Sequence, residues 1–188
     1  FIGAPRPVLP ERSRMEFGLF QNGFRPTTTP AQTYDEDLAE IVLADQLGFS
    51  EVWISEHHGE PVYINKVDTL PIPELLMCRA ASVTQNIRMG AAVKLLHLQH
   101  PLDIALQAAI TDQMLHGRYM FGIGSGFPNA MFSNERGLSF DDRYGRMQES
   151  LEFILKAWSA NEQFDWPGKY WKATQVVSTP LPYQRPHP

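Results

Sequence analysis

The run Glu56-His57-His58 is the segment of this chain best suited to acid–base chemistry. Imidazole is the side chain whose charge changes most readily near neutral pH, and an adjacent carboxylate can orient or tune it. The run directly follows the apolar segment 51–55, which predicts that it lies at the end of a strand. Because neighbouring side chains on a strand point to opposite faces, we expect only one of the two histidines, His57, to face a site. The alternative is that both are hydrogen-bonded residues of a loop.

Two further segments combine small residues with predicted strand ends. Gly124-Ser125-Gly126 follows the strand-like segment 118–123, and Gly90-Ala91-Ala92 lies within the strand-like segment 87–93. The glycine spacing does not match a phosphate-binding fingerprint, since no helix begins directly behind it. Small residues on neighbouring strands would leave the backbone open to a planar ligand, stacked or edge-on. Tight packing between the strands of a barrel is the alternative explanation.

A metal site is a third possibility. His97 and His100 lie after another predicted strand and could join Glu56 and His57 in a set of imidazole and carboxylate ligands. The segment His97-Leu-Gln-His100 lies in a predicted loop, where no helix face presets the ligand geometry, and no metallohydrolase signature is present. We therefore expect no metal at this site.

Four predicted units, each an apolar strand followed by an amphipathic helix, position these segments. The strands are predicted at residues 16–20, 51–55, 87–93 and 118–123, and the helices at residues 33–48, 74–84, from 101 onward, and 141–160. Thr33 with Glu36 would form a capping box at the start of the first helix, and Gly48 would end it. Strands and helices that alternate in this way predict an α/β fold with a parallel sheet, either half of a (β/α)8 barrel or a small open sheet.

The carboxyl ends of parallel strands meet at one edge of a sheet, and catalytic groups gather there. This rule selects the segments 20–24, 56–58, 93–100 and 124–129. Half a barrel would leave two open sheet edges, which folded proteins avoid. We therefore expect that the chain is a fragment, or that another chain completes it.

The last predicted helix and the tail carry many large apolar residues. The helix is expected to turn five of them inward, namely Met147, Leu151, Ile154, Leu155 and Trp158. The tail, residues 164–188, has several aromatic residues and no clear helix, which predicts a connecting segment.

The composition excludes several classes of function. Of the 188 residues, 43% are hydrophobic and 20% are charged, which is typical of a globular domain with a sizeable core. Sixteen Lys and Arg against 21 Asp and Glu give a net charge of −5, which argues against a nucleic-acid partner. No apolar run approaches the roughly 20 residues needed to span a bilayer, and the N-terminal extension, residues 1–14, has no signal core. With a single cysteine, Cys78, a cytoplasmic location is expected.

Taken together, four motifs resemble the bacterial luciferase-like flavin monooxygenase family. They are Met15-Glu-Phe-Gly-Leu-Phe20, Gly48-Phe-Ser-Glu-Val-Trp-Ile-Ser-Glu-His-His58, Ile87-Arg-Met-Gly-Ala-Ala-Val93 with His100-Pro101, and Asp112-Gln-Met-Leu-His-Gly-Arg118 running into Phe121-Gly-Ile-Gly-Ser-Gly126. Their order and intervals make the combination far more specific than any one motif. The resemblance implies that residues 15–188 are the N-terminal half of a (β/α)8 TIM-barrel domain, with the first four strand–helix units.

The resemblance also implies an activity. Enzymes of this family use reduced FMN and O2 to oxygenate a small organic substrate through a flavin peroxide, and a separate NAD(P)H-dependent flavin reductase usually supplies the reduced flavin. A homo- or heterodimer would fit the family. Two alternatives stay open: a deazaflavin-dependent dehydrogenase with the same barrel, and a non-catalytic subunit that supports a luciferase-like dimer.

By the same resemblance, His57 is the catalytic histidine, which assists proton transfer near the reactive edge of the flavin. The residues expected to contact the cofactor are Glu56, Ala91, Ala92, Val93, Gly124, Ser125 and Gly126. Several family members have a non-proline cis peptide in the strand beneath the flavin, and alignment on His100-Pro101 predicts it between Ala92 and Val93. Bacterial luciferase's catalytic subunit has a Cys-Arg pair in place of Gly124-Ser125, so Ser125 would contribute only a hydroxyl to the phosphate site.

Overall fold

The computed structural model describes residues 15–23, 25, 27–58, 70–126 and 139–188. The predicted N-terminal extension, residues 1–14, lies outside the described residues, as do residues 24 and 127–129 at two predicted strand ends. In the described part of the chain, none of the helices has the length and apolar character that a bilayer crossing requires.

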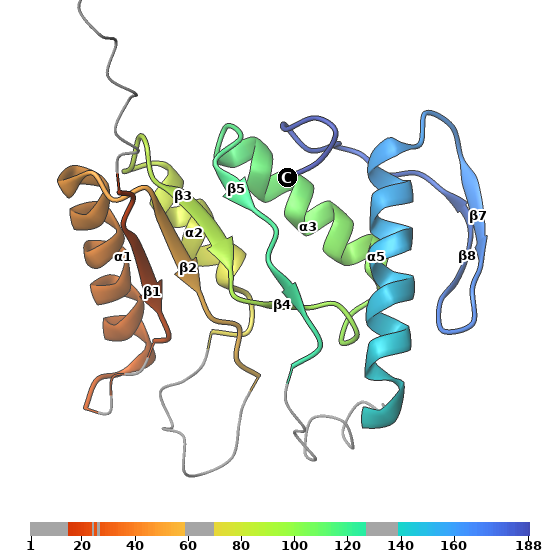
Figure 1. Cartoon of the computed structure of the whole chain (residues 1–188), viewed down its shortest axis with the longest axis horizontal. Helices are drawn as coiled ribbons and strands as arrows, with labels where there is room; N and C mark the ends of the chain where they lie inside the picture. Colours follow the sequence, from red (N-terminus) through yellow and green to blue (C-terminus); the bar gives the residue numbers. More distant parts are fainter. Residues whose placement is uncertain (1–14, 24, 26, 59–69, 127–138) are drawn as a thin grey trace, which may run out of the picture.

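Four parallel strands form the central sheet in the order β1-β2-β3-β5 (Figure 1). They are β1 (Gly18–Gln21), β2 (Glu51–Ile54), β3 (Arg88–Ala91) and β5 (Tyr119–Met120). Two shorter strands, β4 (Lys94–Leu95) and β6 (Ile123–Gly124), follow β3 and β5 and pair with each other in parallel. The third predicted strand is therefore shorter than expected, with β4 just beyond it, and the fourth is divided in two.

Helices alternate with the strands and pack on one face of the sheet (Figure 1). They are α1 (Pro30–Leu47), α2 (Pro73–Ala81), α3 (Pro101–Met114) and α5 (Arg143–Ser159), the last preceded by the short 3-10 helix η1 (Phe140–Asp142). Val52, Ile54 and Met89 on the helix-covered face are fully buried, whereas Phe20 on the other face is 61% exposed. The core therefore lies between the sheet and the helices, and the opposite face is open.

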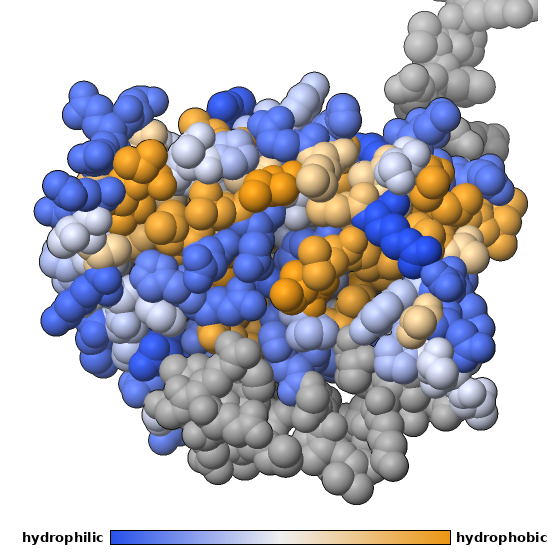
Figure 2. Space-filling view, turned by 180° about the vertical axis from the view of Figure 1, so that it is seen from behind, coloured by the Kyte–Doolittle hydropathy of each residue, from blue (hydrophilic) through white to orange (hydrophobic). Residues whose placement is uncertain are grey.

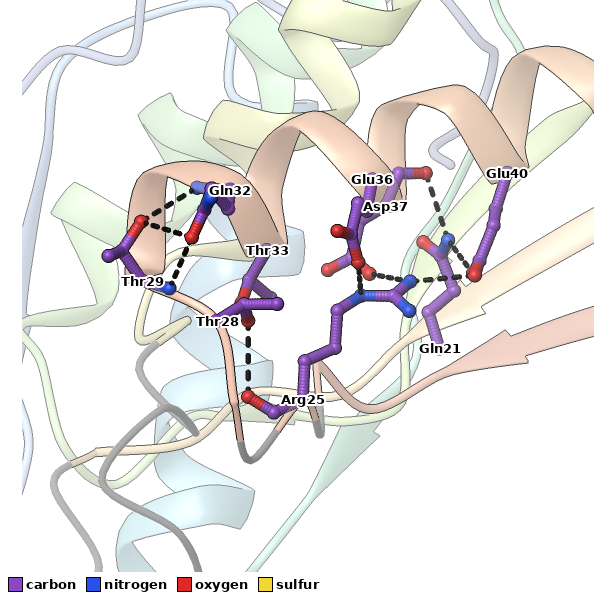
Figure 3. A network of polar contacts seen from close by, with 9 residues as sticks. All are labelled: Gln21, Arg25, Thr28, Thr29, Gln32, Thr33, Glu36, Asp37 and Glu40. Carbon is purple, nitrogen blue, oxygen red and sulfur yellow. Dashed lines mark hydrogen bonds and ion pairs between the residues drawn. The ribbon is translucent and has the colours of Figure 1, made fainter.

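The first helix begins one turn earlier than predicted. Thr29 is its N-cap: the Thr29 hydroxyl accepts from the Gln32 N–H, and the Gln32 side chain accepts from the Thr29 N–H (Figure 3). Pro30 takes the first helical position, where its missing N–H needs no partner. The predicted capping box at Thr33 is therefore wrong, because Thr33 lies within the helix and is 1% exposed. Gly48 ends the helix as predicted, in the left-handed conformation with a φ of 80°.

Arg25 ties the loop after β1 to α1 (Figure 3). Its guanidinium donates to Asp37 at 2.8 Å and to Glu40 at 2.7 Å, and it pairs with Glu36 at 3.3 Å. Asp37 is 2% exposed, and burial raises the pKa of its carboxyl group although Arg25 opposes the shift. Gln21 adds a hydrogen bond from its amide to the Asp37 carbonyl. These contacts hold the carboxyl end of β1 against α1.

Helix α5 buries a different set of side chains from the one predicted. Ile154 and Trp158 are buried as expected, but Leu155 is 37% exposed, so its predicted inward orientation is wrong. Phe153 is fully buried instead, and the ring of Trp166 packs edge-on against it with the ring centres 5.2 Å apart. Aromatic residues of the tail therefore decide which face of α5 is covered.

The tail is more ordered than the predicted connecting segment. It contains an antiparallel hairpin of β7 (Phe164–Pro167) and β8 (Lys172–Val176). The Glu149 carboxylate of α5 accepts hydrogen bonds from the backbone N–H groups of Tyr170 at 3.0 Å and Trp171 at 2.9 Å. Burial opposes the shift, but these bonds lower the pKa of Glu149. The Glu149 carboxylate thus holds the turn between β7 and β8 against α5.

Candidate functional site

Five side chains, four of them buried and the fifth, His58, partly exposed, form a polar cluster at the carboxyl ends of β2 and β3. Lys94 Nζ lies 3.3 Å from Glu56 Oε2 and 3.2 Å from Glu74 Oε2, and Lys94 is 1% exposed. His58 Nε2 lies 2.6 Å from Glu56 Oε1, and the Tyr119 hydroxyl donates to Glu74 Oε1 at 3.3 Å. Burial and the Glu74 carboxylate raise the pKa of Tyr119, so its hydroxyl stays protonated. We call these five residues the lysine cluster.

The two histidines of the predicted proton-handling run have different surroundings. The His58 ring contacts Glu56 in the lysine cluster, whereas the backbone N–H of His57 donates a hydrogen bond to the Leu70 carbonyl at 3.2 Å. The Glu56 side chain, expected to contact a cofactor, is only 1% exposed and faces Lys94 and His58. The catalytic role of His57 stays a prediction. The neighbouring His58 is held by its contact with Glu56.

The glycines of β3 and of the segment after β5 are covered by the protein's own indole ring. A Cβ atom on Gly90 would lie 2.6 Å from Trp53 Cζ3, and one on Gly122 would lie 2.9 Å from the same atom. The planar ring over this pair is therefore Trp53 of β2. Tight packing, the alternative explanation, accounts for these two positions.

The other small residues lie further along the same strands. Ala92, Val93, Gly124, Ser125 and Gly126 are all partly exposed, and β4 and β6 hold them together by pairing. The peptide bond between Ala92 and Val93 is cis, which confirms that prediction.

Ala91, by contrast, is fully buried in the core between the sheet and the helices. Its side chain has no access to a ligand, so any cofactor contact at Ala91 would involve the backbone. The other predicted contact residues stay predictions. We call the edge of the sheet at the carboxyl ends of the strands the rim.

His97 lies on the loop after β4, beside the glycine-rich segment. A Cβ atom on Gly126 would lie 3.8 Å from its Cε1 atom. Burial lowers the pKa of His97 to about 4, Arg143 and Arg146 add to the lowering, and Glu56 opposes it. The ring is therefore neutral near pH 7, and among the described residues its buried Nδ1 has no hydrogen-bond partner.

Two arginines, Arg143 and Arg146, lie in the first turns of α5, directly after the acidic residues of η1. The Arg143 guanidinium lies 4.0 Å from the centre of the Tyr144 ring. A hydrogen bond with Ser125, together with Arg143, lowers the pKa of the Tyr144 hydroxyl. The Arg146 guanidinium lies 5.1 Å from the centre of the Tyr170 ring, and in the described part of the chain its buried Nε has no hydrogen-bond partner. The two guanidinium groups can hold an anion.

Neither arginine was predicted from the sequence as a site residue. The available signal was Arg143-Tyr-Gly-Arg146 at the start of a helix that follows the glycine-rich segment, in a chain with a net charge of −5.

The metal alternative has no support in the described ranges. Within them, no group of three or more His, Cys, Asp or Glu side chains is arranged to hold a metal ion. His100, one of its four candidate ligands, caps α3 by accepting a hydrogen bond from the Leu102 N–H at 3.2 Å. Its ring packs edge-on against Phe153 and Trp171.

Comparison with known proteins places this arrangement in a family. The model of the luciferase-like monooxygenase family matches residues 15–188. The 3,6-diketocamphane 1,6-monooxygenase of Pseudomonas putida is 36% identical over 172 residues, which cover 85% of this chain and 44% of that protein. The chain thus spans about half the length of the curated relatives it matches.

Solved structures are also similar to this chain. The oxygenating constituent of 3,6-diketocamphane monooxygenase from Pseudomonas putida, in complex with FMN, has a TM-score of 0.77 at 35% identity, covering 86% of this chain and 44% of that chain. An F420-dependent secondary alcohol dehydrogenase has a TM-score of 0.73, covering 89% and 49%, but its 18% identity shows the fold alone. With the described strands and helices, these overlaps confirm the predicted α/β fold, four strand–helix units of a (β/α)8 barrel. The chain belongs to the luciferase-like monooxygenase family.

Proposed function

We propose that this chain is part of a flavin-dependent monooxygenase that uses reduced FMN and O2 to oxygenate a small organic substrate. The observation that carries the proposal is the rim at the carboxyl ends of the strands. There the predicted proton-handling run 56–58 lies near the neutral His97 and the arginines of α5. A relative that is 35% identical over most of this chain binds FMN.

The residues of this rim fit FMN. Arg146 and His97 each carry a buried nitrogen without a hydrogen-bond partner among the described residues, and both could bind the phosphate, together with the Ser125 hydroxyl. The partly exposed residues around the cis peptide, Ala92 and Val93, would support the ring system with Gly124. When bound, reduced FMN supplies the two electrons with which one atom of O2 enters the substrate and the other leaves as water.

The chain itself would orient the reactants and manage protons. His57 would hold and pass on a proton at its imidazole ring. The apolar rings of Phe20 and Trp53 on the open face would help to keep water from the reacting groups.

The proposal includes partners. The diketocamphane relative is an oxygenating constituent, which suits a separate NAD(P)H-dependent flavin reductase as the source of reduced flavin. Seen from behind, the surface carries an extended hydrophobic region (Figure 2). Large apolar residues exposed on α1, α2 and α3 include Leu43, Leu75 and Met114. We infer a homo- or heterodimer through this helical face, which light scattering on the purified protein would detect. A single cysteine suits the cytoplasm.

An anaerobic titration of the full-length protein tests the proposal. Reduced FMN and reduced deazaflavin are added separately, the quenching of protein fluorescence is followed, and air is then admitted with a panel of small ketones and terpenes. We expect tight binding of reduced FMN and an oxygenated product that appears only with both flavin and O2. Binding of deazaflavin with hydride transfer would instead identify the dehydrogenase. FMN binding without any product, restored by a second subunit, would identify a supporting subunit.

A further inference from the structure

We propose that Lys94 is a positioning residue that holds the Glu56 carboxylate, and through it the His58 ring, in place beside His57. The inference rests on the proposed function for its activity readout. The contacts themselves are between side chains of this chain and do not depend on that function.

The contacts of Glu56 lead to this inference. Its Oε1 atom contacts His58 Nε2 at 2.6 Å and accepts a long hydrogen bond from the Leu95 N–H at 3.4 Å. Its Oε2 atom has no hydrogen-bond partner among the described residues, and its ion pair with Lys94 Nζ at 3.3 Å is what balances it. With 1% of the side chain exposed, water does not replace that partner. Lys94 therefore fixes one oxygen of Glu56 and leaves the other directed at His58.

The other contact of Lys94 is with the helical layer. Glu74 Oε2 lies 3.2 Å from the same Nζ atom, and Glu74 belongs to the first turn of α2. Its other oxygen accepts from the Tyr119 hydroxyl at 3.3 Å. Lys94 thus links the segment after β2 to α2 and β5, which are themselves part of the core.

The charge balance of the cluster dictates the variants for the test. Among the described residues, Lys94 is the lysine beside these two buried carboxylates, so Lys94→Met alone removes the cation that they share there and destabilises the fold. The double variant Lys94→Met with Glu74→Gln removes one positive and one negative charge together. Glu74→Gln is the matched control. It removes the charge of the other carboxylate, which lies at nearly the same distance from Nζ, and leaves the Lys94–Glu56 pair in place.

Two readouts on the full-length protein separate positioning from simple structural support. The first is the NMR signal of the proton between His58 Nε2 and Glu56 Oε1, measured without flavin. The second is the yield of product per reduced FMN, measured with the dissociation constant of reduced FMN. In the double variant we expect the ring-proton signal to disappear by exchange with water and the yield to fall about tenfold, with the dissociation constant within about twofold of the wild type. In Glu74→Gln both readouts should match the wild type.

Two results would overturn the proposal. One is a double variant that keeps both the ring-proton signal and the yield, which would make Lys94 a mere counter-charge. The other is an equal loss of signal and yield in Glu74→Gln, which would show that the contact of Lys94 with Glu56 matters no more than its contact with Glu74. If the wild type forms no product, the proposed function fails, and the NMR comparison still decides the role of Lys94. If Lys94→Met does not fold, the double variant carries the test.

Discussion

Charged side chains near the two ends of the strands have different partners. Asp45 and Arg118, partly exposed near the amino ends, bind the backbone, whereas the buried Lys94 near the carboxyl ends binds carboxylates. The Asp45 carboxylate, at the amino end, accepts hydrogen bonds from the N–H groups of Gln85, Asn86 and Ile87 at 2.9, 2.8 and 2.7 Å. Arg118 at the same end donates to the Ile87 carbonyl at 3.0 Å. In the lysine cluster, by contrast, Lys94 Nζ lies beside the carboxylates of Glu56 and Glu74.

The difference separates stability from function. A charge that satisfies backbone groups fixes the path of the chain, here the turn that leads into β3. A charge that holds another titratable side chain fixes the orientation of a group that can react. This agrees with the general division of (β/α)8 barrels, in which the carboxyl-end face carries the chemistry and the opposite face carries stability. Substitutions at the two ends should therefore have different kinds of effect.

The largest effect is expected at the carboxyl end, from His57→Ala. Loss of a general acid–base group should lower the yield of product per reduced FMN about 100-fold, with little change in flavin binding. His116→Asn at the amino end is the control, since the φ of 53° at His116 is one that asparagine tolerates. Rapid-mixing kinetics with product analysis provides the measurement. An unchanged yield in His57→Ala would remove this histidine from the mechanism.

A smaller effect, of a different kind, is expected from Asp45→Ala. Three backbone N–H groups lose their acceptor, and because the site is partly exposed we expect a loss of about 2 kcal/mol in the free energy of unfolding. Urea denaturation measures this loss. Reduced FMN should bind this variant as it binds the wild type. A loss of flavin binding at full stability would contradict the separation of the two ends.

Much of this arrangement could be predicted from the sequence, because it depends on local patterns. The four strands, the end of α1 at Gly48 and the segment that carries His57 all follow from apolar runs and from a residue that favours one backbone conformation. The start of α1 was misplaced because Thr29 and Thr33 both have a suitable residue three positions later, and only Pro30 distinguishes them.

Features that depend on distant contacts could not be predicted in this way. The indole of Trp53 lies on two glycines that come 37 and 69 positions later in the sequence, Gly90 and Gly122. Phe153 replaces Leu155 in the core because a tail aromatic, Trp166, packs against it. Lys94 carried a signal, a lone charge in an apolar run, but its partners belong to other elements.

The smallest expected effect is on the pH dependence of the free energy of unfolding. His97 at the carboxyl end and Asp45 at the amino end should contribute to it in different pH ranges. The pKa of His97 falls from 6.5 to about 4 on folding, so between these values the unfolded chain binds a proton that the folded chain does not. Stability should therefore decrease as the pH is lowered through this window, by about 1 kcal/mol for a partly exposed ring.

His97→Gln should remove that decrease. Burial opposes the shift, but the three backbone hydrogen bonds lower the pKa of Asp45 below 3.8, so its contribution is present above that pH and is lost only as the pH falls further. Asp45→Ala should therefore keep the decrease between pH 6.5 and about 4, which belongs to His97. Urea denaturation of both variants across this range measures the slopes. If His97→Gln keeps the slope of the wild type, the ring at the rim is already solvated, and a neutral imidazole there cannot be part of the proposed anion site.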